Sequence, residues 1–406
     1  MTNGSISAEQ NGEWKEVHLS QGISLLSGHH VLAQFCNDHG IGTPYLTGPS
    51  DFPDGRIANT KYTTRPTTIC KSGDILVTVK GSGVGSLAFA DGSYCISRQL
   101  MAVRTTDWNS RFVYYLLASS SDRFSGAATG LIPGLSRSDL LELRLLLPSR
   151  SEQNAIAQAL RDIDDLIASL DALIAKKRDI KQAAMQQLLT GKTRLPPFAK
   201  TSMVLSEIGE LPEDWEVRTL ASLGEPLIGL TYRPSDVRDT GTLVLRSSNV
   251  QDGNLSFENN VFVDPEAATR ALVAEGDILI CVRNGSRALI GKCAIIDARA
   301  SGMAFGAFMA VFRSPHSAFL HHQFQSNTIQ KQIHEHLGAT INQITNASLR
   351  SFKVPFPKNP DERSAIVAIL SDIGSELSAL DDKVSKLRAV REGMMQQLLT
   401  GRIRLV

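Results

Sequence analysis

Two glycine-containing segments are the parts of this sequence whose spacing comes nearest to a catalytic or nucleotide-binding motif. Residues 191–193 (Gly-Lys-Thr) have the ending of a phosphate-binding P-loop, but the first glycine of that motif would have to lie at position 186, which is Gln186. Residues 81–85 (Gly-Ser-Gly-Val-Gly) do not have the G-x-G-x-x-G spacing of a dinucleotide site. We interpret the first segment as a helix end and the second as a loop after a strand.

Five histidines, at positions 316, 321, 322, 334 and 336, are dense enough to raise the possibility of a metal site. The first close pair is adjacent in sequence, and the second is two residues apart on a predicted helix, so neither pair shares one helix face. We therefore expect no metal ligands. The Asn/Asp-Pro-Pro-aromatic tetrapeptide of adenine methyltransferases is absent, and no catalytic residue is predicted, so the chain is not expected to be an enzyme.

Composition places further limits on function. The chain has 406 residues, of which 42% are apolar and 20% are charged, and this length allows two or three domains with real cores. Its net charge of +1 argues against a protein that grips nucleic acid alone by bulk electrostatics. No apolar run is long enough to span a membrane, no signal peptide is recognisable, and the five cysteines form no CxxC pair, so a cytoplasmic protein with reduced thiols is expected.

An internal repeat organises the whole sequence. Residues 185–195 read MQQLLTGKTRL and residues 395–405 read MQQLLTGRIRL, which are identical at nine of eleven positions and lie 210 positions apart. The similarity continues upstream at the same offset, where Glu152 and Asp171 align with Glu362 and Asp381. A repeat this long indicates a tandem duplication.

Each repeated segment is predicted to be a long helix with one narrow apolar seam. Apolar residues recur at alternating spacings of three and four, which is typical of a coiled coil. The predicted seam comprises Ile156, Leu160, Ile163, Ile167, Leu170, Ile174, Ile366, Leu370, Ile373, Leu377, Leu380, Val384 and Leu387. The two helices are expected to pack on each other. Lys177 stands where the second copy has Leu387, so the seam is expected to be partly open or to take a third partner there.

The segments that precede the helices are weakly similar to each other. Residues 73–80 and 276–283 both begin with Gly-Asp and continue as a β-branched run, and residues 111–117 and 318–324 each predict a short helix. The predicted fold class is therefore α+β, with two globular domains, two long helices and a pseudo-two-fold internal repeat. The predicted boundaries are 1–147 for the first domain, 148–195 for the first helix, 196–356 for a linker with the second domain, and 357–406 for the second helix.

This order of segments resembles the specificity subunit of type I restriction-modification systems. The likeness covers essentially the whole chain, and the paired Gln-Gln-Leu-Leu-Thr-Gly elements with Glu152-Gln153 carry it most specifically; the second copy departs with Asp361-Glu362-Arg363. The resemblance implies two target recognition domains, each reading one half of a split, asymmetric site on double-stranded DNA. It also implies an antiparallel pair of helices that sets the spacer length and docks two adenine-N6 methyltransferase subunits, to which restriction (motor and nuclease) subunits bind.

The same resemblance implies that cofactors belong to the partners. S-adenosylmethionine, ATP and Mg are expected on the methyltransferase and restriction subunits, and none on this chain. Loop residues that can reach the donor and acceptor pattern of the major groove are the candidate DNA-binding residues. They are Lys80, Ser82 and Arg98 in the first domain, and Arg246, Ser247, Asn249, Arg283, Asn284 and Arg287 in the second.

A second interpretation stays open at this stage. A degenerate orphan subunit, or a non-catalytic coiled-coil scaffold for protein partners, would also have nearly neutral domains. The complete duplication with intact helices favours the DNA-specificity subunit.

Overall fold

The computed structural model describes residues 14–58, 61–81, 83–120, 134–199, 202–337 and 342–405. The chain divides into two compact units. Unit 1 consists of residues 1–171 with 382–406, and unit 2 consists of residues 172–381. The division cuts through both long helices, so each unit contains one α+β domain together with one half of each helix.

Unit 1 contains three antiparallel or mixed sheets, of strand order β1-β11, β2-β10-β7-β8 and β3-β5-β4-β9-β6. Its strands are β1 (Lys15–His18), β2 (Ile23–Ser27), β3 (Cys36–Asn37), β4 (Thr43–Leu46), β5 (Tyr62–Thr63), β6 (Ile69–Cys70), β7 (Ile75–Thr78), β8 (Leu87–Phe89), β9 (Tyr94–Ile96), β10 (Leu100–Thr105) and β11 (Arg144–Leu147). Its short helices are α1 (Ser110–Ser119) and α3 (Arg137–Leu141).

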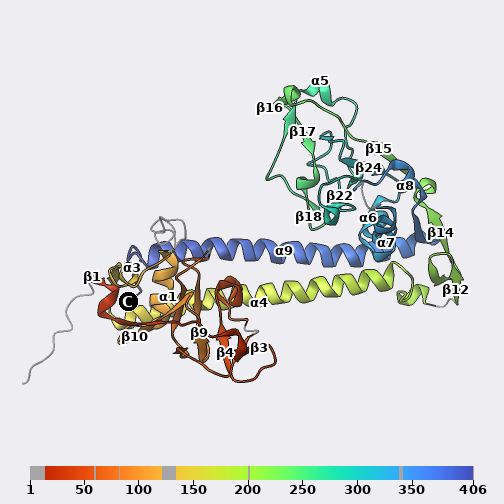
Figure 1. Cartoon of the computed structure of the whole chain (residues 1–406). Coiled ribbons are helices and arrows are strands. Elements are labelled where there is room, and N and C mark those ends of the chain that lie inside the picture. Colours follow the sequence, from red (N-terminus) through yellow and green to blue (C-terminus); the bar gives the residue numbers. More distant parts are fainter. Residues whose placement is uncertain are drawn as a thin grey trace, which may run out of the picture. The chain divides into compact units, whose positions relative to one another are not determined.

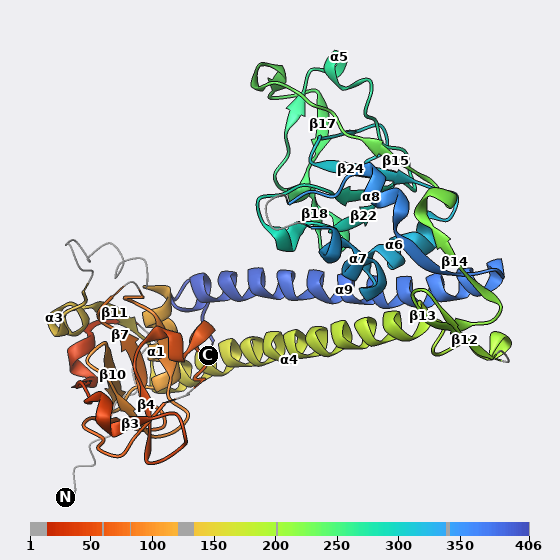
Figure 2. The same ribbon diagram turned by 45° about the vertical axis from the view of Figure 1, so that its right-hand side comes forward.

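Unit 2 repeats this set with additions, as β14-β25, β15-β24-β21-β22 and β16-β20-β17-β23, plus the hairpins β12-β13 and β18-β19. Its strands are β12 (Met203–Ser206), β13 (Gly209–Pro212), β14 (Trp215–Thr219), β15 (Glu225–Ile228), β16 (Val237–Arg238), β17 (Thr242–Leu245), β18 (Val250–Gln251), β19 (Asn254–Leu255), β20 (Phe262–Val263), β21 (Ile278–Cys281), β22 (Cys293–Ile295), β23 (Ala304–Phe305), β24 (Met309–Arg313) and β25 (Lys353–Pro357). Its short helices are α5 (Pro265–Ala268), α6 (Ser317–Gln325), α7 (Asn327–His336) and α8 (Asn346–Ser351). Figure 2 shows α6 and α7 between the sheet that contains β22 and helix α9 (Pro360–Leu398).

The repeated Gly-Asp motif has the same structural role in both units. Asp74 lies just before β7 and accepts hydrogen bonds from Arg104 Nε and Nη2, at 2.8 and 2.7 Å. Asp277 lies just before β21 and accepts the same pair of bonds from Arg313, at 2.8 and 2.6 Å. Both aspartates are buried, and a two-pronged guanidinium contact is the geometry that satisfies a buried carboxylate. The motif therefore joins two central strands of the four-stranded sheet.

Helices α4 (Arg150–Leu188) and α9 have 39 residues each, as the seven-residue apolar repeat predicts. Within each unit one half of α4 lies antiparallel to one half of α9 (Figure 1). In unit 1, Arg388 binds Asp171, and in unit 2 the counterparts Arg178 and Asp381 form the same ion pair. These pairs are largely exposed and contribute little free energy each, but they fix the register of the two helices.

Burial of the predicted seam follows the heptad pattern. Nine of the thirteen residues are buried, and Ile167, Ile373, Leu380 and Leu387 are half-buried. Each fully buried Leu or Ile side chain stabilises the fold by about 1.5–3 kcal/mol relative to exposure. The apolar seam, rather than the charged pairs, therefore holds the helices together.

The seam is expected to be partly open or to take a third partner at Lys177, and this stays a prediction. Lys177 Nζ bonds Glu376 Oε1 at 2.7 Å, and the Glu376 side chain is 53% exposed, so an ion pair that reaches solvent occupies this position. The repeat offset makes Leu387 the counterpart of Lys177 and Leu166 the counterpart of Glu376. Unit 2 thus has an ion pair at the positions where unit 1 has Leu166, which is 42% exposed, and Leu387, which is half-buried.

The repeated Met-Gln-Gln-Leu-Leu-Thr-Gly element ends each helix and anchors it to a domain. Met185, Leu188 and Leu189 are buried in the core of unit 2, and their counterparts at 395, 398 and 399 are buried in the core of unit 1. Gly191 and Gly401 follow with φ of 69° and 70°, the left-handed conformation of a C-terminal helix cap. This confirms the interpretation of the P-loop-like segment as a helix end.

An arginine in each of these tails closes a buried cluster with a glutamate and a tryptophan. In unit 1, Glu152 accepts hydrogen bonds from Arg404 Nε and Nη2 and from Trp14 Nε1, at 2.7, 2.8 and 3.2 Å. In unit 2, Glu362 accepts bonds from Arg194 and Trp215 in the same arrangement. The segment that follows α9 thereby binds the first turn of α4, and the segment that follows α4 binds the first turn of α9.

Candidate functional site

Three loops meet at one edge of each unit. In unit 2, β17 and β23 are parallel neighbours, so the loops that follow them emerge on the same side. Gly306 N donates to Leu245 O at 3.0 Å. Val282 N and Arg283 N donate to Phe308 O at 3.0 and 3.1 Å, which brings in the loop after β21. We call residues 246–248, 283–284 and 306–308 the rim of unit 2.

Unit 1 builds the same edge with the same backbone hydrogen bonds. Strands β4 and β9 are parallel, Ser97 N donates to Leu46 O at 2.9 Å, and Val79 N donates to Gln99 O at 2.8 Å. Residues 47–48, 80–81 and 97–99 form the rim of unit 1. By these bonds Gln99 is the counterpart of Phe308, and an isolated bridge at Lys80 matches one at Arg283.

Four of the six candidates predicted in the second domain lie on the rim of unit 2. Asn284 Nδ2 donates to Ser247 Oγ at 3.1 Å, which links two of the loops. The guanidinium carbon of Arg283 lies 5.1 Å from the ring centroid of Phe308. Arg246 Nη2 donates to the carbonyl of Asn259 at 3.0 Å. The edge thus carries two guanidinium groups beside hydrogen-bonding side chains.

The other two candidates are held by structural contacts. Asn249 is fully buried; its Oδ1 accepts from Arg246 N at 2.9 Å and its Nδ2 donates to Ser256 O at 2.9 Å. The structure therefore contradicts Asn249 as a residue that could reach a base. Arg287 donates to the carbonyl of Leu337 at 2.7 Å, where it satisfies the C-terminal end of α7. Both residues were chosen by residue type. Sequence alone does not show which side-chain amide and guanidinium groups already make hydrogen bonds within the protein.

In unit 1 the structure places Lys80 and Arg98 on the rim, and both side chains are exposed. Ser82 lies outside the described residues. Sequence reasoning missed Gln99 and Phe308, which occupy equivalent rim positions. The internal repeat is the signal that could have identified them. Aligning the strand ends of the two copies places Gln99 and Phe308 at equivalent positions, whatever their residue types.

Each rim borders a hollow, and the two hollows differ in chemistry. The hollow of unit 2 has a volume of about 940 Å³ and a largely apolar wall, whereas that of unit 1 has a volume of about 430 Å³ and a wall of mixed polar and apolar surface. The residues that differ include Tyr232, Val261 and Phe308 in unit 2, and Asp38, Lys61, Arg98 and Gln99 in unit 1. The same scaffold thus presents two unlike surfaces.

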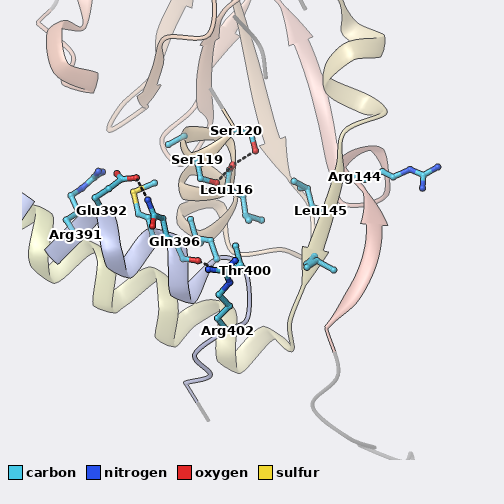
Figure 3. Close-up of a pocket in the computed structure, with 14 residues that line it drawn as sticks. Leu116, Ser119, Ser120, Arg144, Leu145, Arg391, Glu392, Gln396, Thr400 and Arg402 are labelled. Atoms are coloured by element: carbon cyan, nitrogen blue, oxygen red, sulfur yellow. Dashed lines mark hydrogen bonds between the residues drawn. The ribbon is translucent and has the colours of Figure 1, made fainter. Parts of the chain in front are cut away.

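A further pocket of about 790 Å³ in unit 1 lies among α1, β11 and the end of α9, where Arg391, Glu392 and Gln396 line one side (Figure 3). In unit 2 helix α7 packs beside the equivalent strand, since Gln332 Nε2 donates to Lys353 O at 2.8 Å. Residues 121–133, which follow α1 in the sequence, lie outside those described.

The histidines do not form a metal centre in the described part of the chain, where no three His, Cys, Asp or Glu side chains gather suitably. His321 Nε2 lies 2.8 Å from Gln325 Nε2, and His322 Nε2 lies 3.4 Å from Ser371 Oγ. Burial, with the nearby Lys181 ammonium, lowers the pKa of His321 to about 4. Burial, with His321 and Lys181, lowers the pKa of His322 to about 3. These are neutral packing residues at ordinary pH.

Among the described helices none is long and apolar enough to cross a membrane.

The chain contains two related α+β units. Each unit has a rim at the ends of parallel strands and is completed by the tail of the other copy. This arrangement defines a duplicated recognition protein. A family model, the type I restriction modification DNA specificity domain, matches residues 11–176 and 212–385. The chain belongs to this family, which confirms the resemblance seen in the sequence, and such specificity subunits are in general non-catalytic.

Two curated relatives support the assignment. The chain is 24% identical over 402 residues to the MjaVIII specificity subunit of a type I restriction enzyme from Methanocaldococcus jannaschii, covering 97% of this chain and 93% of that protein. It is 28% identical over 278 residues to a putative MjaX specificity subunit from the same organism, covering 66% of this chain and 61% of that protein.

Solved structures share the fold. The S subunit of a type I restriction-modification system from M. genitalium matches with a TM-score of 0.64 at 17% identity, over 97% of this chain and 98% of that one. A chain from a structure of type I R-M complex assembly and conformational transition matches with a TM-score of 0.54 at 17% identity, over 97% and 99%. The predicted fold class is thereby confirmed.

Proposed function

We propose that each unit of this specificity subunit reads one half of a split, asymmetric site on double-stranded DNA through its rim. The observation that supports this most directly is the pair of equivalent rims with different side chains. Arginine, lysine, glutamine and asparagine side chains can pair with base edges in the major groove. Two different rims on one scaffold would read two different half-sites.

The two helices would set the distance between the half-sites. A helix of 39 residues is about 60 Å long at about 1.5 Å per residue, which exceeds one turn of B-DNA of about 34 Å. We propose that the same helices dock two adenine-N6 methyltransferase subunits, and that restriction subunits join the resulting complex. A change in helix length would then alter the spacer and leave both half-sites unchanged.

The chain itself would carry out no catalysis. S-adenosylmethionine, ATP and Mg would be bound by the partner subunits, which would also supply most of the phosphate contacts that a protein of net charge +1 lacks. The complex would act on chromosomal DNA in the cytoplasm.

The experiment that tests this function is long-read methylation sequencing of DNA from cells that express the chain with its neighbouring methyltransferase. The expected result is a split motif that carries N6-methyladenine on each strand. Replacing residues 1–147 with the first domain of another specificity subunit should change only one half-site. If a stable, purified complex gave no methylation, an orphan subunit or a scaffold for other proteins would be the better interpretation.

A further inference from the structure

Phe308 is an exposed aromatic residue at the centre of the rim of unit 2. Its side chain is 56% exposed, although a large apolar side chain gains by burial. The ring is flanked by the Arg283 guanidinium, and its backbone carbonyl accepts hydrogen bonds from Val282 N and Arg283 N at 3.0 and 3.1 Å. The loop that carries it is therefore held in place while the ring faces solvent.

The hollow beside Phe308 contains polar groups that no described residue satisfies. Its wall includes Leu230, Tyr232, Val261 and Met309, all of which offer apolar surface. Arg246 Nε and Ser248 Oγ, on the same wall, are buried and have no hydrogen-bond partner among the described residues. A buried donor without a partner costs about 1–3 kcal/mol. Because both atoms lie beneath the wall, the two side chains must rotate before a ligand acceptor can reach them and recover this free energy.

The equivalent position in unit 1 has the opposite character. Gln99 replaces Phe308, and Arg98 precedes it where unit 2 has Ala307. Gln99 N is held by Ser97 Oγ at 3.1 Å, so this loop is also fixed by local hydrogen bonds. One rim therefore offers an amide and a guanidinium at the place where the other offers an apolar ring.

The C5 methyl of thymine is the largest apolar group that a base presents in the major groove. Adenine instead offers N7 and N6, the pair that a glutamine amide matches. The Arg283 guanidinium beside Phe308, and that of Arg246 on the wall of the same hollow, carry the positive charge that complements DNA phosphates.

We propose that Phe308 is a specificity-determining residue that recognises the methyl group of a thymine in the half-site read by unit 2, with Arg246 and Ser248 donating to acceptors of the same DNA segment. Gln99 reads the equivalent step of the other half-site by hydrogen bonds. This inference rests on the proposed function, since it requires that the rims face DNA.

The test uses the full chain in complex with its methyltransferase subunits and a duplex that contains the methylated motif. Each thymine of the half-site assigned to unit 2 is replaced in turn by uracil, which removes only the methyl group. We expect one position at which uracil weakens binding about four-fold, the effect of exposing one methyl group. The Phe308→Ala complex should bind the thymine and uracil duplexes equally, and Phe308→Leu should retain part of the difference.

The matched control is Gln99→Ala, which should leave the uracil effect in the half-site of unit 2 unchanged. If the wild-type complex binds and methylates a split motif but shows no uracil effect in that half-site, the inference fails and the proposed function stands. A uracil effect that persists in Phe308→Ala would also overturn the assignment to this residue. If no split motif is bound or methylated, the proposed function fails and the inference fails with it.

Discussion

Arg404 binds both carboxylate oxygens of Glu152, at 2.7 and 2.8 Å, although the two residues lie 252 positions apart in the chain. Arg194 and Glu362 form the same contact in unit 2. The offset of 210 relates the two pairs, so each ion pair joins a residue of one copy to a residue of the other. Each compact unit is complete only when the tail of the opposite copy is in place.

The first prediction concerns the more deeply buried of these contacts. The Arg194→Met variant removes the cation that pairs with Glu362, whose side chain is only 2% exposed. Breaking a buried ion pair in this way lowers the free energy of unfolding by about 3–5 kcal/mol. The free energy of unfolding of unit 2, measured by denaturant titration, should fall by about that amount. Arg144→Met is the control, because Arg144 and its partner Glu16 are more than 60% exposed, and it should cost less than about 1 kcal/mol. Equal losses in both variants would contradict a special role for the buried contact.

The second prediction concerns the glycine that ends each helix. Gly191→Ala should destabilise strongly, because φ is 69° and a Cβ atom would lie 2.5 Å from Pro212 Cδ. Gly401→Ala has the same backbone strain, but its new Cβ atom would lie 3.2 Å from the Trp14 ring. The loss of stability should therefore be close to that of the backbone strain alone, about 1–2 kcal/mol. Gly393→Ala, inside α9 with no atom near its Cβ, should instead stabilise by about 1 kcal/mol. Thermal unfolding of the three variants checks the order.

The third prediction is a loss of stability in mildly acidic solution. Burial lowers the folded-state pKa of His321 to about 4 and that of His322 to about 3, below the unfolded value of about 6.5. The unfolded state therefore binds more protons below pH 6.5, and stability falls as pH decreases from about 6.5 towards 4. Each histidine contributes a slope of about 1.4 kcal/mol per pH unit in that range. Unfolding free energies measured from pH 7 to 5 should show this slope, and His322→Phe should reduce it; an unchanged slope would refute the assignment.

The fourth prediction separates rim residues from structural ones. Lys80→Ala and Arg283→Ala should weaken DNA binding by the complex, each about ten-fold, with little effect on thermal stability, because both side chains are exposed at equivalent rim positions. Arg287→Ala should lower stability instead, because it removes the donor to the Leu337 carbonyl. Binding and unfolding measured on the same preparations distinguish the two outcomes. A large loss of binding in Arg287→Ala without destabilisation would place that residue on the DNA interface.

The sequence predicted the parts of this fold that follow from periodicity and repetition. Heptad spacing predicted two long helices, which the structure places at Arg150–Leu188 and Pro360–Leu398, inside the predicted segments 148–195 and 357–406, and the repeated Gly-Asp motif located β7 and β21. The contact between Glu152 and Arg404 was not predicted, although both residues belong to aligned repeats. Sequence alone does not show that the segment after each long helix binds the first turn of the other helix.

The candidate site was less accessible to sequence reasoning. Four residues that residue type selected in the second domain, Arg246, Ser247, Arg283 and Asn284, lie on the rim of unit 2. Residue type also selected Asn249, whose side-chain amide makes hydrogen bonds within a local turn. Phe308 was overlooked because an apolar residue beside a strand is ordinarily assigned to the core. Only the backbone hydrogen bonds that unite three loops reveal that it lies at the edge.

The ion pair between Lys177 and Glu376 has a consequence for self-association of the chain. If two α4 helices from separate molecules paired antiparallel in this register, each Lys177 would face Leu166, and two α9 helices would likewise set Glu376 against Leu387. Both mismatches desolvate a charge without a counter-ion, so unlike helices are preferred over like ones. Replacing both charges by leucine should abolish that discrimination and increase the fraction of dimers in which like helices pair, measured by analytical ultracentrifugation. The charge-reversed double variant, Lys177→Glu with Glu376→Lys, should preserve the monomer. A single ion pair beside an apolar seam would thus favour the pairing of α4 with α9 over the pairing of two identical helices.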